Sequence, residues 1–102
     1  MTLLCFVTCS SPEEARKIAD SLLEKRLIAC ANILTGVESH YLWKGKLEKG
    51  SEALLILKTG KGLQAKVEKE IKKLHSYELP VIEFFDVKTS KVVEKWIEKE
   101  TP

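Results

Sequence analysis

Residues 28–59 read IACANILTGVESHYLWKGKLEKGSEALLILKT, and this stretch contains the strongest structural signal in the chain. Side chains from Val37 to Trp43 alternate in direction, as the two faces of a strand require. Lys44-Gly45 then supplies a turn, and the returning segment ends in the apolar run Ala53–Leu57. Such a run is typical of a strand that is covered on both faces. The stretch therefore predicts a long β-hairpin whose second arm lies in the middle of a sheet.

The predicted hairpin is longer than the domain that carries it. Two arms of about a dozen residues would reach roughly 40 Å, whereas a domain of about 100 residues has a radius of gyration of about 13 Å. Because an isolated hairpin is marginal in water, we expect another copy of the chain to pack against it. The residues expected at this interface are Tyr41, Trp43, Lys44 and Gly45. The alternative is that Gly36 and Gly50-Ser51 bend the arms, so that the hairpin folds back on itself.

Composition limits the classes of protein to which the chain can belong. Its 102 residues, 44% of them hydrophobic, predict one small domain over residues 1–102. The formal charge of +2 gives no indication of nucleic acid or anionic lipid as a partner. No apolar run approaches the ~18 residues of a membrane span, and the N-terminus lacks the basic flank of a signal peptide. We therefore expect a cytoplasmic protein.

The three cysteines do not form a recognisable framework. Cys5, Cys9 and Cys30 are an odd number without a CxxC spacing, which argues against both a disulfide scaffold and a zinc ribbon. Cys5 and Cys9 would lie on the same face of one strand, about 13 Å apart. They can therefore neither form a disulfide nor bind the same ion directly.

The remaining segments complete an α+β pattern. Ser11-Pro12, with Glu14 three residues after the serine, has the form of a capping box at a helix start. The expected elements are a strand at Leu3–Thr8, a helix to about Lys25, a helix at about Leu63–Leu74, a strand at Val81–Val87 and a helix after Ser90. This order predicts the ferredoxin-like split βαβ fold, with an antiparallel sheet, both main helices on one face and an extra C-terminal helix. The apolar face expected for the last helix consists of Val92, Val93, Trp96 and Ile97.

Four segments resemble the signatures of a known family. They are IACANI from Ile28, VESHYLWKGKLE from Val37, ALLILKT from Ala53 and HSYELPVI from His75. In this order and at this spacing, they resemble the CutA divalent-cation tolerance proteins. The resemblance runs from Leu3 to about Trp96. In two places the chain departs from the family: Ser76 stands where proline is usual, and the customary glycine and tyrosine before Trp96 are absent.

The resemblance implies an assembly and a function. It implies a tight homotrimer in which the long hairpins pair between subunits, related in fold to trimeric PII-type signalling proteins. The implied role is tolerance to copper and other divalent metals, with metal ions as ligands. Cys9 takes the place of a proposed copper-ligating cysteine of some members, and His75 matches the histidine of the family's His-Pro-Tyr motif.

Cys9 and His75 are therefore the candidate ligands for copper or another divalent cation, because thiolate and imidazole suit such ions. Each residue has an alternative role. Cys9 would serve as a small core residue, and His75 would cap the negative end of the second helix. Two ligands are fewer than the four of a closed structural site, so we expect weak binding unless a subunit interface completes the shell. Weak binding fits a sensor or buffer better than a metalloenzyme.

Other functions receive less support from the sequence. A PII-like sensor would bind a small anionic metabolite between subunits, with Lys58, Lys46 and Arg26 as charge partners. The candidate ligand cleft consists of Lys58, Tyr77 and Glu78. The chain has no nucleophile signature, no HExxH motif and no spaced cofactor glycines, which argues against an enzyme. Its apolar strands lack the glycine-aromatic signature of an RNA recognition motif.

Overall fold

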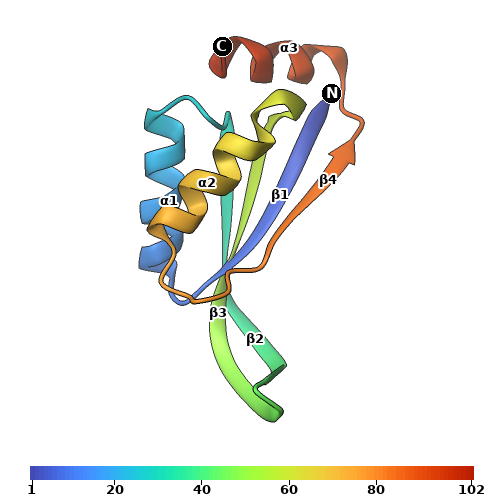
Figure 1. Cartoon of the computed structure of the whole chain (residues 1–102). Coiled ribbons are helices and arrows are strands. Elements are labelled where there is room, and N and C mark those ends of the chain that lie inside the picture. The colour runs from blue at the N-terminus through green and yellow to red at the C-terminus, as the bar shows by residue number, and fades with distance from the viewer.

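The computed structural model describes residues 1–102, and its strands form one antiparallel sheet in the order β2-β3-β1-β4 (Figure 1). The elements are β1 (Thr2–Cys9), α1 (Pro12–Glu24), β2 (Cys30–Trp43), β3 (Lys46–Gly60), the short 3₁₀ helix η1 (Lys61–Leu63), α2 (Gln64–Leu74), β4 (Ile82–Val87) and α3 (Lys91–Glu100). Helices α1 and α2 cover one side of the sheet, and α3 lies across its end, near the N-terminus (Figure 1). The ferredoxin-like α+β prediction is confirmed.

The β2-β3 hairpin projects beyond the rest of the chain (Figure 1). The molecule measures 45 × 24 × 22 Å, and the two strands stay paired as far as Trp43 and Lys46. Lys44 and Gly45 form the turn with φ angles of 52° and 78°, the left-handed region that a type I′ turn requires. A β-bulge does occur between Leu34 and Val37, where Gly36 has a φ of 72°. The hairpin nevertheless projects, so the alternative that it folds back on itself is wrong.

The hydrophobic core lies between the sheet and the two covering helices. Its members come from both layers: Cys5, Val7 and Cys9 on β1, Leu55 and Leu57 on β3, Ile18 and Leu22 on α1, and Val67 and Ile71 on α2. Glu70 of α2 joins the helices, because it accepts hydrogen bonds from Lys25 Nζ (2.7 Å) and Ser21 Oγ (3.1 Å). The hydrogen bond from Lys25 lowers the pKa of Glu70. The core thus fixes the ends of β1, α1 and α2 relative to one another.

The opposite side of the sheet has no helix over it and is largely apolar. We call it the open sheet face; its large apolar members are Leu4, Phe6, Leu34, Leu54, Ile56 and Phe85. Phe6 and Phe85 pack edge to face, with their ring centroids 5.0 Å apart. In the run Ala53–Leu57, alternate residues are buried under the helices, whereas Leu54 and Ile56 are only half-buried. The single chain therefore covers this strand on one face only, not on both as predicted.

The prediction for the last helix is wrong in part. Ser90 caps α3 as expected, because its Oγ accepts a hydrogen bond from Val93 N (3.4 Å). Of the predicted apolar face, however, only Ile97 is buried, while Val92 is 78% exposed and Trp96 is 41% exposed. The reason is that α3 lies across the end of the sheet rather than along one of its faces (Figure 1).

Candidate functional site

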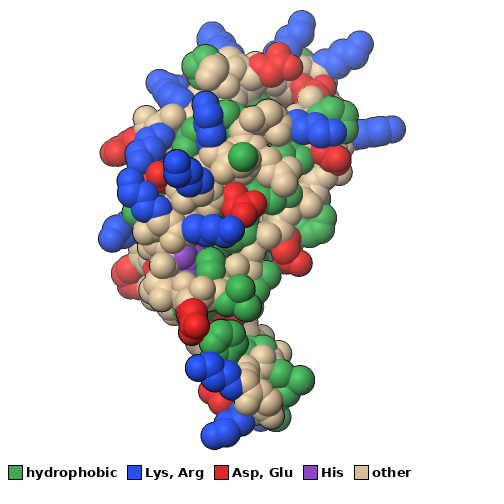
Figure 2. Space-filling model, viewed as in Figure 1, with side chains coloured by type: hydrophobic (Ala, Val, Ile, Leu, Met, Phe, Trp, Pro, Cys, Tyr) green, Lys and Arg blue, Asp and Glu red, His purple; other side chains and the backbone are tan.

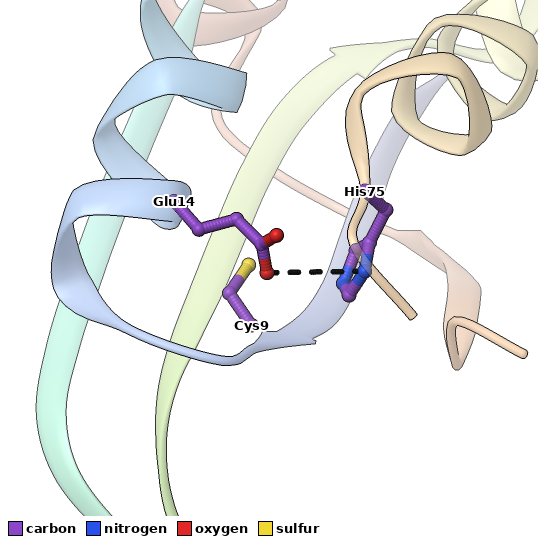
Figure 3. Close-up of side chains that lie close together, drawn as sticks. All are labelled: Cys9, Glu14 and His75. Atoms are coloured by element: carbon purple, nitrogen blue, oxygen red, sulfur yellow. Dashed lines mark ion pairs between the residues drawn. The ribbon is translucent and has the colours of Figure 1, made fainter. Parts of the chain in front are cut away.

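Three side chains of metal-ligating type meet where β1, α1 and α2 come together (Figure 3). Cys9 ends β1, Glu14 stands in the first turn of α1, and His75 directly follows α2. One ligand atom from each residue lies within 4.8 Å of the other two. The two residues predicted from the sequence, Cys9 and His75, are therefore adjacent, and the structure adds Glu14. We call these three residues the triad.

Glu14 reaches the triad because of how α1 begins. Ser11 Oγ accepts a hydrogen bond from Glu14 N (3.1 Å), as expected for a capping box. The Glu14 carboxylate lies against Ser10, and its Oε1 accepts a hydrogen bond from the backbone N–H of Ser10 (2.9 Å). Its Oε2 accepts a hydrogen bond from Ser76 N (2.9 Å). Burial acts to raise the pKa of Glu14, but hydrogen bonds from Ser76 and Ser10 outweigh it and lower the pKa. Glu14 is therefore an ionised oxygen donor.

The His75 imidazole is completely buried, and both of its nitrogens are hydrogen-bonded. Nε2 lies 2.9 Å from the carbonyl oxygen of Thr8, and Nδ1 accepts a hydrogen bond from Tyr77 N (3.1 Å). This pairing corresponds to the neutral ring with its proton on Nε2. Nδ1 also lies 3.8 Å from Glu14 Oε1 (Figure 3). His75 is the C-cap residue of α2, as the alternative role predicted. Its ring, however, is hydrogen-bonded to the carbonyl oxygen of Thr8 near the end of β1 and not to a carbonyl of the helix.

Cys9 belongs both to the core and to the triad. Its side chain is fully buried, with Sγ 4.0 Å from the carbonyl oxygen of Val7. Burial, together with the negative charges of Glu14 and Glu52, raises the pKa of the Cys9 thiol to about 12. The core role and the ligand role therefore do not exclude each other, and an ion that binds here has to displace the thiol proton.

The donor set fits a borderline-soft divalent ion. Sulfur, imidazole nitrogen and carboxylate oxygen are the ligands of zinc sites and suit copper as well. Three donors would leave a fourth position for water or another ligand. In the present arrangement, however, Tyr77 N donates to the Nδ1 lone pair of His75 that an ion would need, and Ser76 N donates to one carboxylate oxygen of Glu14. Ion binding therefore competes with the hydrogen bonds that hold the Ser76–Tyr77 segment.

The residues of the predicted ligand cleft are only partly brought together. Tyr77 and Glu78 line one groove beside the hairpin. Lys58 lies on the open sheet face, where its Nζ donates to Asn32 Oδ1 (3.2 Å). It does not line the groove of Tyr77 and Glu78. Glu14 is the residue that sequence reasoning missed, although its place in a capping box five residues after Cys9 was a signal that it turns toward the end of β1.

Comparisons with known proteins identify the family of the chain. The family model described as CutA1 divalent ion tolerance protein matches residues 3–100. The chain belongs to the CutA1 family. The match confirms the resemblance to the CutA proteins that the four sequence segments indicated. The family's description concerns tolerance of divalent ions and names no reaction.

Individual CutA relatives match over most of the chain. The divalent-cation tolerance protein CutA of Pyrococcus horikoshii is 38% identical over 100 residues, which is 97% of both chains. The solved structure of the periplasmic divalent cation tolerance protein CutA of Archaeoglobus fulgidus has a TM-score of 0.97 at 37% identity and full coverage of both chains. The CutA structure of Thermus thermophilus has a TM-score of 0.96 at 34% identity, again with full coverage.

Some CutA relatives are longer than this chain. The chain spans 44% of the chloroplastic protein CutA of Arabidopsis thaliana and 42% of the mouse protein CutA. As regards membranes, none of the helices of this CutA1 chain is both long and apolar enough to span a bilayer.

Proposed function

We propose that this CutA1 chain binds metal ions as a homotrimer and acts in tolerance to copper and other divalent cations. The observation that supports this best is the triad. Three ligand types converge from three separate elements, in a chain whose family is described by divalent ion tolerance.

The ligand roles follow from the donors. Cys9 would supply a thiolate, Glu14 a carboxylate and His75 an imidazole nitrogen. Cys9 would first have to give up its proton and His75 its hydrogen bond from Tyr77, so the net affinity is reduced by the free energy of these two changes. The proposed site is therefore a reversible one that suits a sensor or buffer, and we propose no catalytic reaction for it.

Self-association is supported by two surfaces of the chain. The open sheet face is apolar, and the hairpin tip presents Tyr41, 47% exposed, and Trp43, 39% exposed. Lys44 and Gly45 form the turn beside them, and Lys44 Nζ lies 5.8 Å from the centroid of the Trp43 ring. We propose that these surfaces meet between subunits. The number of three subunits comes from the resemblance to the family.

The alternative of a PII-like sensor for an anionic metabolite has less support. Its predicted charge partners lie apart from the groove: Lys58 is on the open sheet face, and Arg26 forms an ion pair with Glu100 (2.9 Å). The groove lining includes neither these residues nor Lys46. The cytoplasmic location stays a prediction, because the Archaeoglobus fulgidus relative is described as periplasmic.

Calorimetric titration with zinc and with copper tests the proposed site. We expect saturable binding to the wild type, and a decrease in affinity of at least about tenfold in Cys9→Ser and His75→Ala, because each variant removes one of three donors. Cys30→Ser is the matched control, since Cys30 lies on the open sheet face outside the triad and should leave the affinity unchanged. The proposal fails if the wild type shows no saturable binding, or if both triad variants bind as the wild type does.

A further inference from the structure

Tyr77 connects the triad with the hairpin through three contacts. Its backbone N–H donates a hydrogen bond to His75 Nδ1 (3.1 Å), and its hydroxyl donates to Glu52 Oε2 on β3 (2.7 Å). Its ring also packs against the His75 imidazole, with the ring centroids 4.7 Å apart. One residue is therefore bonded to a candidate metal ligand through its main chain and to the hairpin through its side chain.

Glu52 stands where the hairpin leaves the rest of the sheet. The last residue of β3 that pairs with β1 is Ala53, which lies opposite Cys9 of the triad. From Glu52 to the turn, β3 pairs with β2 alone, and the partner of Glu52 is Val37, directly after the bulge. The molecule narrows where the hairpin leaves the body (Figure 2). We call the pair of Glu52 and Val37 the hairpin root.

The His75 ring has no free nitrogen for a ligand role while both of its present bonds are kept. Nε2 is bonded to the carbonyl oxygen of Thr8, and Nδ1 accepts from Tyr77 N. The ring is completely buried, so it is held in this orientation, with Nδ1 3.8 Å from Glu14 Oε1. Ser76 N donates to the other oxygen of Glu14 and can keep its bond. If Nδ1 serves as a ligand, the residue that has to move is therefore Tyr77.

A displacement of Tyr77 acts on the hairpin root because its hydroxyl is bonded to a carboxylate. Hydrogen bonds to ionised groups are roughly twice as strong as those between neutral groups. Burial, together with the bond to Glu52, raises the pKa of Tyr77, so its hydroxyl is a neutral donor at physiological pH. A tyrosine side chain has only two rotatable bonds between its backbone and its ring. A shift of the Tyr77 main chain away from His75 is therefore transmitted to the hydroxyl.

We propose that Tyr77 is a positioning residue that couples metal binding at the triad to the hairpin root. This inference rests on the metal site proposed above. While Tyr77 is bonded to both Nδ1 and Glu52, the root is held against the body. When His75 acts as a ligand, Tyr77 gives up both bonds and the root is released. Because such coupling is reciprocal, contacts that fix the hairpin in its present position lower the metal affinity of the triad.

Calorimetric zinc titration of the assembled wild type and of Tyr77→Phe tests the coupling. Phenylalanine keeps the ring beside His75 and removes the hydroxyl that is bonded to Glu52. Because the residue is then held less firmly at Nδ1, we expect the zinc affinity to rise about threefold to tenfold. A residue with only a structural role would leave the affinity unchanged or lower it. Tyr41→Phe is the matched control, since it removes the hydroxyl of the other tyrosine and should bind zinc as the wild type does.

Hydrogen exchange followed by mass spectrometry supplies a second readout on the same proteins. On zinc loading of the wild type, we expect faster exchange in the segment that contains Ser76 and Tyr77 and also at the hairpin root. In Tyr77→Phe the root should exchange faster before zinc is added, and zinc should change it no further. Exchange in α3, which lies at the other end of the sheet from the hairpin, should be unaffected throughout (Figure 1).

The outcomes separate this inference from the proposed function. Saturable zinc binding with an equal or lower affinity in Tyr77→Phe would overturn the coupling and leave the metal site standing. So would zinc binding that leaves exchange at the hairpin root of the wild type unchanged. The absence of saturable zinc binding to the wild type would overturn the metal site, and the coupling with it.

Discussion

An Ile56→Lys variant is expected to stay folded and to become monomeric. Ile56 lies at the centre of the open sheet face, between Asn32 on β2 and Phe6 on β1. In a single chain this position is half-buried, so a lysine there can extend its ammonium group into water at little cost. In an assembly that buries the face, the unpaired charge costs several kcal/mol per subunit, which is more than a hundredfold in the association constant.

Sedimentation velocity measures this effect directly. We expect the wild type to sediment as an oligomer and Ile56→Lys to sediment as a monomer with an unchanged circular dichroism spectrum. Leu23→Lys is the control, because it places the same charge at a 38% exposed leucine on α1, away from the open sheet face. A monomeric wild type, or an Ile56→Lys protein with the wild-type mass, would show that the open sheet face is not an interface.

Glu14→Ala is expected to lower the free energy of unfolding by about 3 kcal/mol, because hydrogen bonds to a charged group contribute roughly 1.5–3 kcal/mol each and those lost here are partly exposed. The carboxylate of Glu14 accepts from Ser10 N and Ser10 Oγ at the start of α1 and from Ser76 N after α2. Removing it loosens both segments. Urea unfolding at equal protein concentration measures the loss, because the stability of an oligomer depends on concentration.

The same variant has a predictable dependence on pH. The pKa of folded Glu14 is lowered, so its contribution is complete above the ordinary glutamate pKa of about 4.3 and is lost as the pH falls through the folded value. The difference in stability between the wild type and Glu14→Ala should therefore shrink on acidification below that range. Glu13→Ala, which removes the neighbouring acid, is expected to cost less than about 1 kcal/mol. Equal losses in the two variants would contradict the assigned role of Glu14.

Local patterns were sufficient to predict the fold. The alternation from Val37 to Trp43 and the apolar run at Ala53–Leu57 predicted the hairpin and its central second arm, because strand side chains repeat every two residues. The serine caps of α1 and α3 marked two helix starts that the structure confirms. It was harder to predict which side chains of an element are buried by other elements. The spacing of Val92 fits an apolar stripe, but nothing in the sequence says that α3 crosses only the end of the sheet.

The candidate site could be predicted only in part. Cys9 and His75 were predicted by their match to a family motif, whereas Glu14 joins them through Ser76, which lies 62 residues further along the chain. The capping box indicated that Glu14 turns toward the end of β1, but no local pattern reports its contact with Ser76. Lys58 was grouped with Tyr77 by chemical type alone. It lies six residues from Glu52, the partner of Tyr77, which is about 20 Å along a strand.

X-ray absorption spectroscopy of the zinc-loaded protein tests the central claim most directly. The triad predicts a first shell that contains one sulfur at about 2.3 Å together with nitrogen and oxygen ligands at about 2.0–2.2 Å. Cys9→Ser should remove the sulfur contribution, and Cys30→Ser should leave it unchanged. A shell of nitrogen and oxygen alone in the wild type, or a sulfur contribution that survives in Cys9→Ser, would contradict a metal site built from Cys9, Glu14 and His75.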